Sequence, residues 1–158
     1  MKLPYYYLQR MRLRSFADLC DKGRLIDVRT ALDNGANVNE VNNVDSTGLM
    51  MAILFGHDHV AEVLLQHPAI DVNIVDNIGY SALHMAVSAD NHKMTAMLLA
   101  RRDLTRATIN HRNHEGQSPI MIAIDCNSVN CIPLLLACTK VDLNMRARPH
   151  RSPQEICK

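Results

Sequence analysis

The stretch Gly79-Tyr-Ser-Ala-Leu-His-Met-Ala86 determines the architecture of the chain, because close counterparts lie on either side of it. The counterparts are Thr47-Gly-Leu-Met-Met-Ala52 and Gly116-Gln-Ser-Pro-Ile-Met-Ile-Ala123. In each, a Ser or Thr precedes a small residue or Pro, then an aliphatic residue, and an Ala lies five positions after the hydroxyl. Ser and Thr are good helix N-caps, and Pro is tolerated directly after the cap. The stretches therefore predict three helix starts, each with a small residue where another helix can approach.

A second series of residues runs out of phase with the first. It consists of an aliphatic residue followed by Asn at Val38-Asn39, Val72-Asn73, Ile109-Asn110 and Leu143-Asn144. The asparagines are separated by 34, 37 and 34 positions. Two interlocked series with one period indicate a structural repeat.

A second, apolar helix is predicted in each repeat. The stretches with apolar residues at the spacing of a buried helical stripe are 26–32, 60–65, 94–99 and 132–136. Pro133 falls in the first turn of its helix, where no internal amide bond is lost. Turns precede these helices at Lys22-Gly23, Phe55-Gly56, Asp90-Asn91 and Cys126-Asn127, and polar loops follow at 40–46, 74–80, 111–117 and 145–151. One helix pair cannot bury its own apolar face, so the pairs are expected to stack as a solenoid.

With these two series of residues, the sequence resembles the ankyrin-repeat family, whose period is about 33 residues with the signature Thr-Pro-Leu-His-x-Ala. The resemblance covers residues 14–158 and implies an all-α ankyrin-repeat solenoid of stacked helix-turn-helix units with hairpin-like loops. The expected repeats are 14–41, 42–75, 76–112 and 113–146. Residues 147–158 match the start of a fifth unit at Ser152-Pro153 and are expected to form a partial C-terminal cap. Residues 1–13 are interpreted as an N-terminal cap or arm, with a partner-binding or lipid-binding arm and disorder as alternatives.

Several positions depart from the family pattern. The signature His occurs only as His84, with Met50 and Met121 in its place elsewhere, and the resemblance implies that His84 hydrogen-bonds to Ser81. Asp90 and Asn127 replace the Gly that ends the first helix. Extra residues in 100–109 predict a bulged loop.

The composition limits which classes of partner and which cellular compartment are expected. The 17 basic and 16 acidic residues nearly cancel, so the chain has no long-range field for nucleic acid or an anionic membrane. Five cysteines without a secretory signal favour free thiols in a reducing compartment. We therefore expect an intracellular protein, cytoplasmic and also nuclear if the basic run 146–151 serves as an import signal.

Catalytic, metal and cofactor sites are not expected. His57 with His59, and His111 with His114, form pairs, but structural zinc sites usually need four closely spaced ligands. Cys131 and Cys138 fall on an apolar helix and are interpreted as buried, whereas Cys20 and Cys126 end first helices and are expected to be partly exposed. The six glycines are scattered and form no phosphate-binding loop. The chain is therefore predicted not to be an enzyme and to bind no cofactor.

The resemblance implies that partners bind the concave side, formed by the loop tips and the exposed ends of the first helices. The residues at these positions are Asn43, Val44, Ser46, Leu54, Phe55, Asn77, Ile78, Tyr80, Ser88, His114, Glu115, Gln117, Asp125, Cys126, Arg146, Arg148 and Arg151. Val44, Phe55, Ile78 and Tyr80 are apolar where solvent is expected, which favours an interaction patch; packing between adjacent loops is the alternative. The expected partner of this monomer is a protein segment with apolar anchors followed by acidic or phosphorylated residues that contact the arginines.

Three functional interpretations remain open. The first is an adaptor or inhibitor that occupies a partner surface. The second is a fragment of a larger multidomain scaffold, and the third is a relative of the small cyclin-dependent kinase inhibitors, which the segment 111–116 resembles. Separately, Asn73 and Asn144 resemble the pattern that the ankyrin-directed Asn hydroxylase modifies, since each is preceded by an Asp and one apolar residue and has a Leu eight positions earlier.

Overall fold

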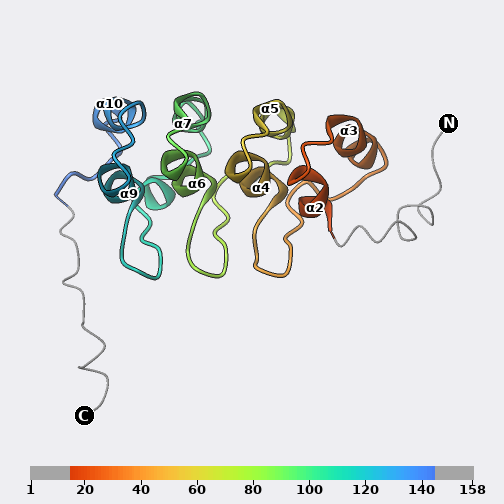
Figure 1. Cartoon of the computed structure of the whole chain (residues 1–158), viewed down its shortest axis with the longest axis horizontal. Helices are drawn as coiled ribbons and strands as arrows, with labels where there is room; N and C mark the ends of the chain where they lie inside the picture. The colour runs from red at the N-terminus through yellow and green to blue at the C-terminus, as the bar shows by residue number, and fades with distance from the viewer. Residues whose placement is uncertain (1–14, 145–158) are drawn as a thin grey trace, which may run out of the picture.

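The computed structural model describes residues 15–144, and every regular element in that range is a helix. Four helix pairs follow one another: α2 (Phe16–Cys20) with α3 (Leu25–Asp33), α4 (Gly48–Leu54) with α5 (Asp58–Gln66), α6 (Ala82–Ser88) with α7 (His92–Leu99), and α9 (Pro119–Asp125) with α10 (Ile132–Ala137). The pairs stand side by side in a row, with α3, α5, α7 and α10 along one edge and loops projecting from the other (Figure 1). This arrangement confirms the predicted all-α solenoid. The expected N-terminal arm and partial C-terminal cap lie outside the described residues.

The first helices begin where the sequence predicts. The side chains of Thr47 and Ser81 cap α4 and α6 by accepting hydrogen bonds from the amides of Met50 and His84. Ser118 occupies the cap position of α9, but its buried hydroxyl has no hydrogen-bond partner among the described residues. Ser15, which we did not predict, caps α2 by accepting from the amide of Asp18. Local sequence therefore determines where these helices start.

Left-handed residues end the first helices. Gly23 and Gly56 have φ values of 64° and 72°, and Asp90 and Asn127, predicted to replace Gly, have φ values of 47° and 54°. This conformation costs little for Gly and is tolerated by Asp and Asn. The chain therefore reverses at the same register in every pair.

The core lies between successive helix pairs. The first helices pack in series, α2 on α4, α4 on α6 and α6 on α9. Ala52, Ala86 and Ala123, the small residues of the repeated motif, are fully buried, as predicted. Leu49, Ile53 and Leu83 fill the space around them, and burying side chains of this size contributes roughly 1.5–3 kcal/mol each.

The prediction that Cys20 is partly exposed is wrong. Its thiol is buried against the next repeat, where a Cβ atom added to Gly48 would lie 2.7 Å from Sγ. The missing side chain at Gly48 makes room for a neighbour that lies 28 positions earlier, and the local sequence around Cys20 does not reveal this contact.

The extra residues of 100–109 form a short helix, α8 (Arg106–Ile109), rather than an irregular bulge. Thr105 caps it by accepting a hydrogen bond of 3.1 Å from the amide of Thr108. The hydroxyl of Thr108 donates in turn to Oδ1 of Asn73, at 2.7 Å. The insertion is thus attached to the preceding repeat.

The asparagines of the second series link consecutive repeats. Asn39 donates to the carbonyl of Ala69 and accepts from the amide of Asp71, at 2.7 and 2.8 Å. Asn110 bonds in the same way to the carbonyl of Lys140 and the amide of Asp142, at 2.8 and 2.7 Å. Asn73 makes the equivalent pair of bonds. Each of these side chains therefore fixes the distance between two neighbouring loops.

Candidate functional site

An Asn or Asp at the start of each projecting loop shapes its tip. Oδ1 of Asn42 accepts from the amides of Val44 and Ser46, both at 3.0 Å. Oδ1 of Asp76 accepts in the same way from Ile78 and Tyr80, at 3.1 and 2.7 Å. In the third loop, Asn113 accepts from the amide of Gln117 at 2.8 Å. We did not predict these residues, although the recurrence of Asn or Asp at one register was a usable signal.

Backbone hydrogen bonds join the three loop tips into a row. The amide of Asn77 donates to the carbonyl of Val44 at 3.2 Å, and the amide of His114 donates to the carbonyl of Ile78 at 2.9 Å. Gly79 permits the second approach, because its φ is +83° and an added Cβ would lie 2.9 Å from Cα of Asn113. The loops therefore present their side chains from a preorganised edge, which lowers the ordering cost of binding.

Four of the predicted apolar positions, at the loop tips and the end of α4, are exposed. Val44 is 42% exposed, Leu54 47%, Phe55 53% and Ile78 52%. Val44 and Ile78 come from adjacent loop tips joined by the hydrogen bond above, and Leu54 and Phe55 come from the end of α4. We call Val44, Leu54, Phe55 and Ile78 the loop-side patch. Within residues 15–144, none of these four side chains is buried.

Two of the predicted surface residues need revision. Ser46 is only 3% exposed, because the loop folds back and Ser46 exchanges hydrogen bonds with Asn42. It is therefore removed from the binding surface. Tyr80 is half-buried, with its ring centroid 5.4 Å from that of His84, so the packing alternative describes Tyr80 better than the patch does.

The remaining predicted residues are polar and mostly exposed. Asn43, Asn77, Ser88, His114, Glu115, Asp125 and Cys126 face solvent. Gln117 is half-buried and its Nε2 donates to Oδ2 of Asp125 at 2.8 Å, which ties the third loop to the end of α9. Arg146, Arg148 and Arg151 lie outside the described residues.

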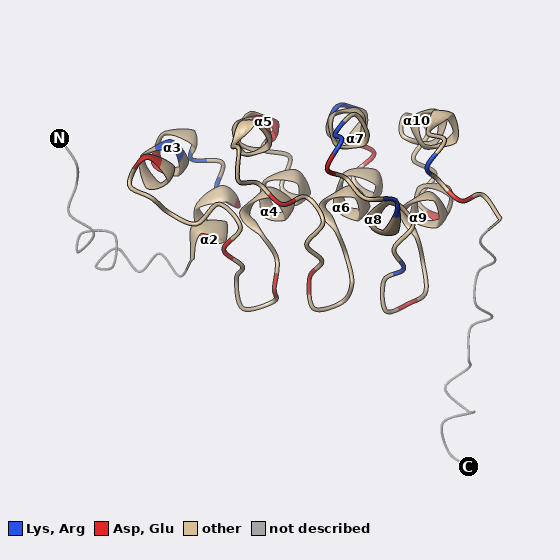
Figure 2. Ribbon diagram, turned by 180° about the vertical axis from the view of Figure 1, so that it is seen from behind, with Lys and Arg blue, Asp and Glu red and all other residues tan. Residues whose placement is uncertain are grey.

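Acidic residues dominate the charge of the described loops. Figure 2 shows acidic positions on all three loops and a basic position on the third. Asp45 and Glu115 are exposed at the tips, whereas Arg112 donates from Nη1 to the carbonyl of Gly116 at 3.0 Å. The exposed tips of the described loops therefore carry acidic residues.

The histidines of the first pair, His57 and His59, have structural contacts. Nε2 of His57 lies 2.8 Å from the carbonyl oxygen of Asp21, and Nε2 of His59 lies 3.0 Å from that of Gly23. Both therefore brace the turn of the preceding repeat. Among residues 15–144, no group of three or more His, Cys, Asp or Glu side chains is placed to hold a metal ion.

Burial favours the neutral thiol form of two cysteines. Burial raises the pKa of the Cys20 thiol to about 12, with the nearby charge of Asp21 acting in the same direction. Burial also raises the pKa of Cys131. Since the thiolate is the nucleophile, neither thiol is suited to covalent catalysis.

His84 forms the contact with Ser81 that the resemblance implied. Its Nδ1 lies 2.9 Å from Oγ of Ser81 and also accepts from the Ser81 amide at 3.1 Å. Burial lowers the pKa of His84 to about 4, although the backbone of Gln117 and of His111 favours the charged ring. His84 is therefore a neutral structural residue that completes a capping box.

Comparison with known proteins identifies the architecture. The family described as ankyrin repeats (3 copies) matches residues 19–108 and 68–147. The chain belongs to the ankyrin-repeat family. This membership agrees with the solenoid, the loop row and the Ser81–His84 contact, and it characterises the chain as a protein–protein interaction module.

Ankyrin-repeat relatives occur in larger proteins. The chain is 33% identical over 113 residues to the nuclear factor NF-kappa-B p105 subunit of Rattus norvegicus, covering 72% of this chain and 11% of that protein. It is 32% identical over 120 residues to the same subunit of Gallus gallus, covering 76% and 12%. It is 33% identical over 85 residues to neurogenic locus notch homolog protein 1 of Homo sapiens, covering 54% and 3%. The chain thus corresponds to a small part of each relative.

Within residues 15–144, no helix combines the length and the apolar character that are needed to cross a bilayer.

Proposed function

We propose that this ankyrin-repeat chain is a non-catalytic adaptor or inhibitor that binds a partner protein through the loop-side patch. The observation that carries the proposal is the exposure of Val44, Leu54, Phe55 and Ile78 on a hydrogen-bonded framework. Exposed apolar side chains have no structural role there, and aromatic and aliphatic anchors contribute most of the energy of many interfaces.

The rigidity of the surface supports the proposal. Asn42 and Asp76 fix the loop tips, and the asparagines at 39, 73 and 110 fix the spacing of the repeats. A preorganised surface loses little conformational entropy on binding, so a small set of anchors suffices. A monomer acting in the cytoplasm or nucleus fits the free thiols of Cys20, Cys126, Cys131 and Cys138.

The partner is expected to be a segment with apolar side chains that fill the patch and acidic or phosphorylated residues that reach Arg146 and Arg148. Guanidinium groups bind carboxylates and phosphates through paired hydrogen bonds. Reversal of both arginines to Glu should weaken binding and reduce its salt dependence. Unchanged affinity in this variant would remove the arginines from the proposed site while leaving the patch intact.

Affinity capture from native lysate with matched variants tests the patch. The double variant Phe55→Glu/Ile78→Glu places two charges in it without disturbing the half-buried Tyr80. Ile26→Glu is the control, because Ile26 is 80% exposed on α3 at the opposite edge, and circular dichroism checks the fold of all three proteins. The proposal predicts that wild type and Ile26→Glu capture the same partner and that the double variant loses it. Equal capture by all three proteins would show that binding lies elsewhere.

A further inference from the structure

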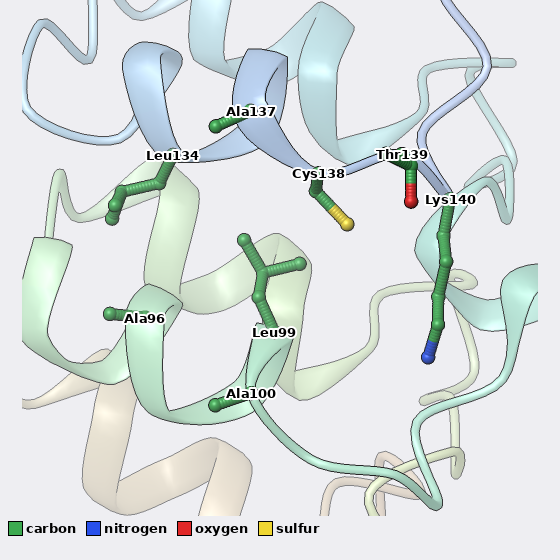
Figure 3. A pocket seen from close by; sticks show the side chains of 8 residues that line it. All are labelled: Ala96, Leu99, Ala100, Leu134, Ala137, Cys138, Thr139 and Lys140. Atoms are coloured by element: carbon green, nitrogen blue, oxygen red, sulfur yellow. The ribbon is translucent and has the colours of Figure 1, made fainter.

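The outer helices of the solenoid leave an open groove at one seam. The groove lies between α7 and α10, has a volume of about 420 Å³ and is predominantly apolar. Its lining consists of Ala96, Leu99, Ala100, Leu134, Ala137, Cys138, Thr139 and Lys140 (Figure 3). We call it the α7–α10 groove. It lies along the edge opposite the projecting loops (Figure 1).

Long polar side chains close the equivalent seam between α5 and α7. The ammonium group of Lys93 pairs with the carboxylate of Glu62 across that seam. Nη1 of Arg101 donates to the carbonyl of Leu65 at 2.6 Å. The same guanidinium pairs with Asp103, which holds it over the seam. One repeat earlier, therefore, the chain fills this space with its own side chains.

The α7–α10 groove is open because shorter side chains stand at the matching positions. In the register of the repeat, Ala96 corresponds to Glu62, Ala100 to Gln66 and Cys138 to Arg101. Asn130 corresponds to Lys93, and its side chain donates to Asp90 in the turn before α7 rather than to a residue of α7. The opening thus coincides with shorter side chains at these positions.

The groove has an apolar end and a cationic end. Leu134, Ala96, Leu99 and Ala100 lie toward one end, and Thr139 and Lys140 lie at the other (Figure 3). No carboxylate lines the groove. Lys140 corresponds to Asp103 in the register, and within residues 15–144 it forms no ion pair; its Nζ lies 3.5 Å from the carbonyl oxygen of Leu104. A molecule that fills the groove would therefore need to supply both apolar side chains and a negative charge.

We propose that the α7–α10 groove docks a short amphipathic helix of a partner protein, with apolar side chains between α7 and α10 and an Asp or Glu beside Lys140. Ala96 on α7 and Ala100 at its C-cap are one helical turn apart, so they leave space for the ridge of a third helix. The carboxylate of the partner would pair with Lys140, as the carboxylate of Asp103 pairs with Arg101 at the preceding seam. The chain would then bind one protein on its loop side and another on its outer helices.

A peptide selection with two variants tests this proposal. A display library of random peptides of about 16 residues, near the length at which isolated helices become stable, is selected against the full chain. Cys138→Arg fills the groove with the side chain that stands at the preceding seam, and Ala96→Glu provides a second blocked variant if the first one folds poorly. Lys140→Glu reverses the charge at the cationic end, and Phe55→Glu identifies peptides that bind the loop-side patch instead.

The proposal predicts a class of apolar, acidic peptides whose Kd rises about tenfold or more in the blocked variant and is unchanged by Phe55→Glu. Lys140→Glu should reverse their preference, so that matched Lys-containing peptides bind better than the acidic ones. Selection of patch-directed peptides alone would overturn the proposal. A gain in affinity after removal of residues 145–158 would also overturn it, because that segment would then be the occupant of the groove. A wild-type dimer that Cys138→Arg dissociates would overturn it as well, because a second copy of the chain would be the occupant.

Discussion

His84 is a buried residue whose charge state the fold constrains. Its Nδ1 accepts two hydrogen bonds from Ser81, so a proton on Nδ1 would break both. Burial lowers its pKa to about 4 from the usual 6.5. Because the pKa of His84 is lower in the folded state than in the unfolded chain, its contribution to the free energy of unfolding is fully present above pH 6.5. This contribution is lost as the pH falls toward 4. We predict that this group removes about 1 kcal/mol from the free energy of unfolding between pH 8 and pH 5.5.

The His84→Met variant isolates this effect from the other histidines. Met50 and Met121 occupy the same register, so the repeat accommodates Met there. The variant should be less stable at pH 8, because Ser81 loses an acceptor, but its stability should fall less between pH 8 and pH 5.5. Urea unfolding of both proteins at the two pH values measures the difference. Parallel losses would mean that His84 is not the titrating group.

Asp90 and Asn127 hold the same position in successive repeats but differ in their bonds. Both are left-handed, where Gly is least strained. Asp90 accepts hydrogen bonds from the amides of Asn130 and Cys131 and from the side chain of Asn130, and these bonds lower its pKa although desolvation opposes them. No side-chain hydrogen bond holds Asn127 within the described residues. We predict that Asn127→Gly stabilises the fold by up to about 1 kcal/mol, whereas Asp90→Gly destabilises it.

Thermal unfolding of the two Gly variants compares these effects directly. Asp90→Gly should also weaken the acid dependence of stability. A group whose pKa is lowered stabilises the fold above its unfolded value of 3.8 and loses this contribution as the pH falls through the folded value. If Asp90→Gly and Asn127→Gly shift the midpoint temperature of unfolding in the same direction, the assignment of Asp90 as a link between repeats would be contradicted.

At the scale of the helix, the start of α4 depends on its neighbour. Gly48 follows the cap, where α6 has Ala82 and α9 has Pro119. Ala is the better helix former, so propensity alone predicts that Gly48→Ala is stabilising. The buried Cys20 thiol would lie 2.7 Å from the new Cβ, and Cε1 of Phe16 would lie 3.1 Å from it. We therefore predict a loss of about 1–3 kcal/mol.

A double-mutant cycle with Cys20→Ala measures the coupling between the two positions. Removal of the thiol creates the space that the methyl group added at Gly48 needs, so Gly48→Ala should cost less in the Cys20→Ala background than in the wild type. Chemical unfolding of the four proteins gives both values. Equal costs in the two backgrounds would show that Cys20 does not limit this site.

Local signals in the sequence predicted most of the helices. Thr47, Ser81 and Ser118 mark the first helices correctly, because cap chemistry acts within one turn. The sequence also indicated the residues that become the loop-side patch, since register determines which positions face outward. It did not reveal the burial of Cys20 or Ser46, because the groups that cover them belong to another repeat or to the folded loop. The helix α8 was missed for the same reason, because Asn73 of the preceding repeat anchors it.

At the scale of the whole molecule, residues that recur in every repeat can be distinguished from residues that occur in one repeat only. The linking asparagines recur in successive repeats, as do the Ser or Thr at the start of each first helix and the buried Ala, and all of them hold the stack together. Phe55, which corresponds to Ala89 and Cys126, and Cys138 of the α7–α10 groove, which corresponds to Arg101, do not recur, although Val44 and Ile78 of the loop-side patch share one register. Features particular to one repeat are therefore the best candidates for specific binding.

Hydrogen–deuterium exchange of the chain alone and with a captured partner tests the central claim most directly. If the partner covers the loop-side patch, exchange should slow in peptides that span 42–55 and 76–88 and stay unchanged in 25–33, which contains Ile26. Protection confined to α3, α5, α7 and α10, with none in the loops, would contradict binding on the loop side.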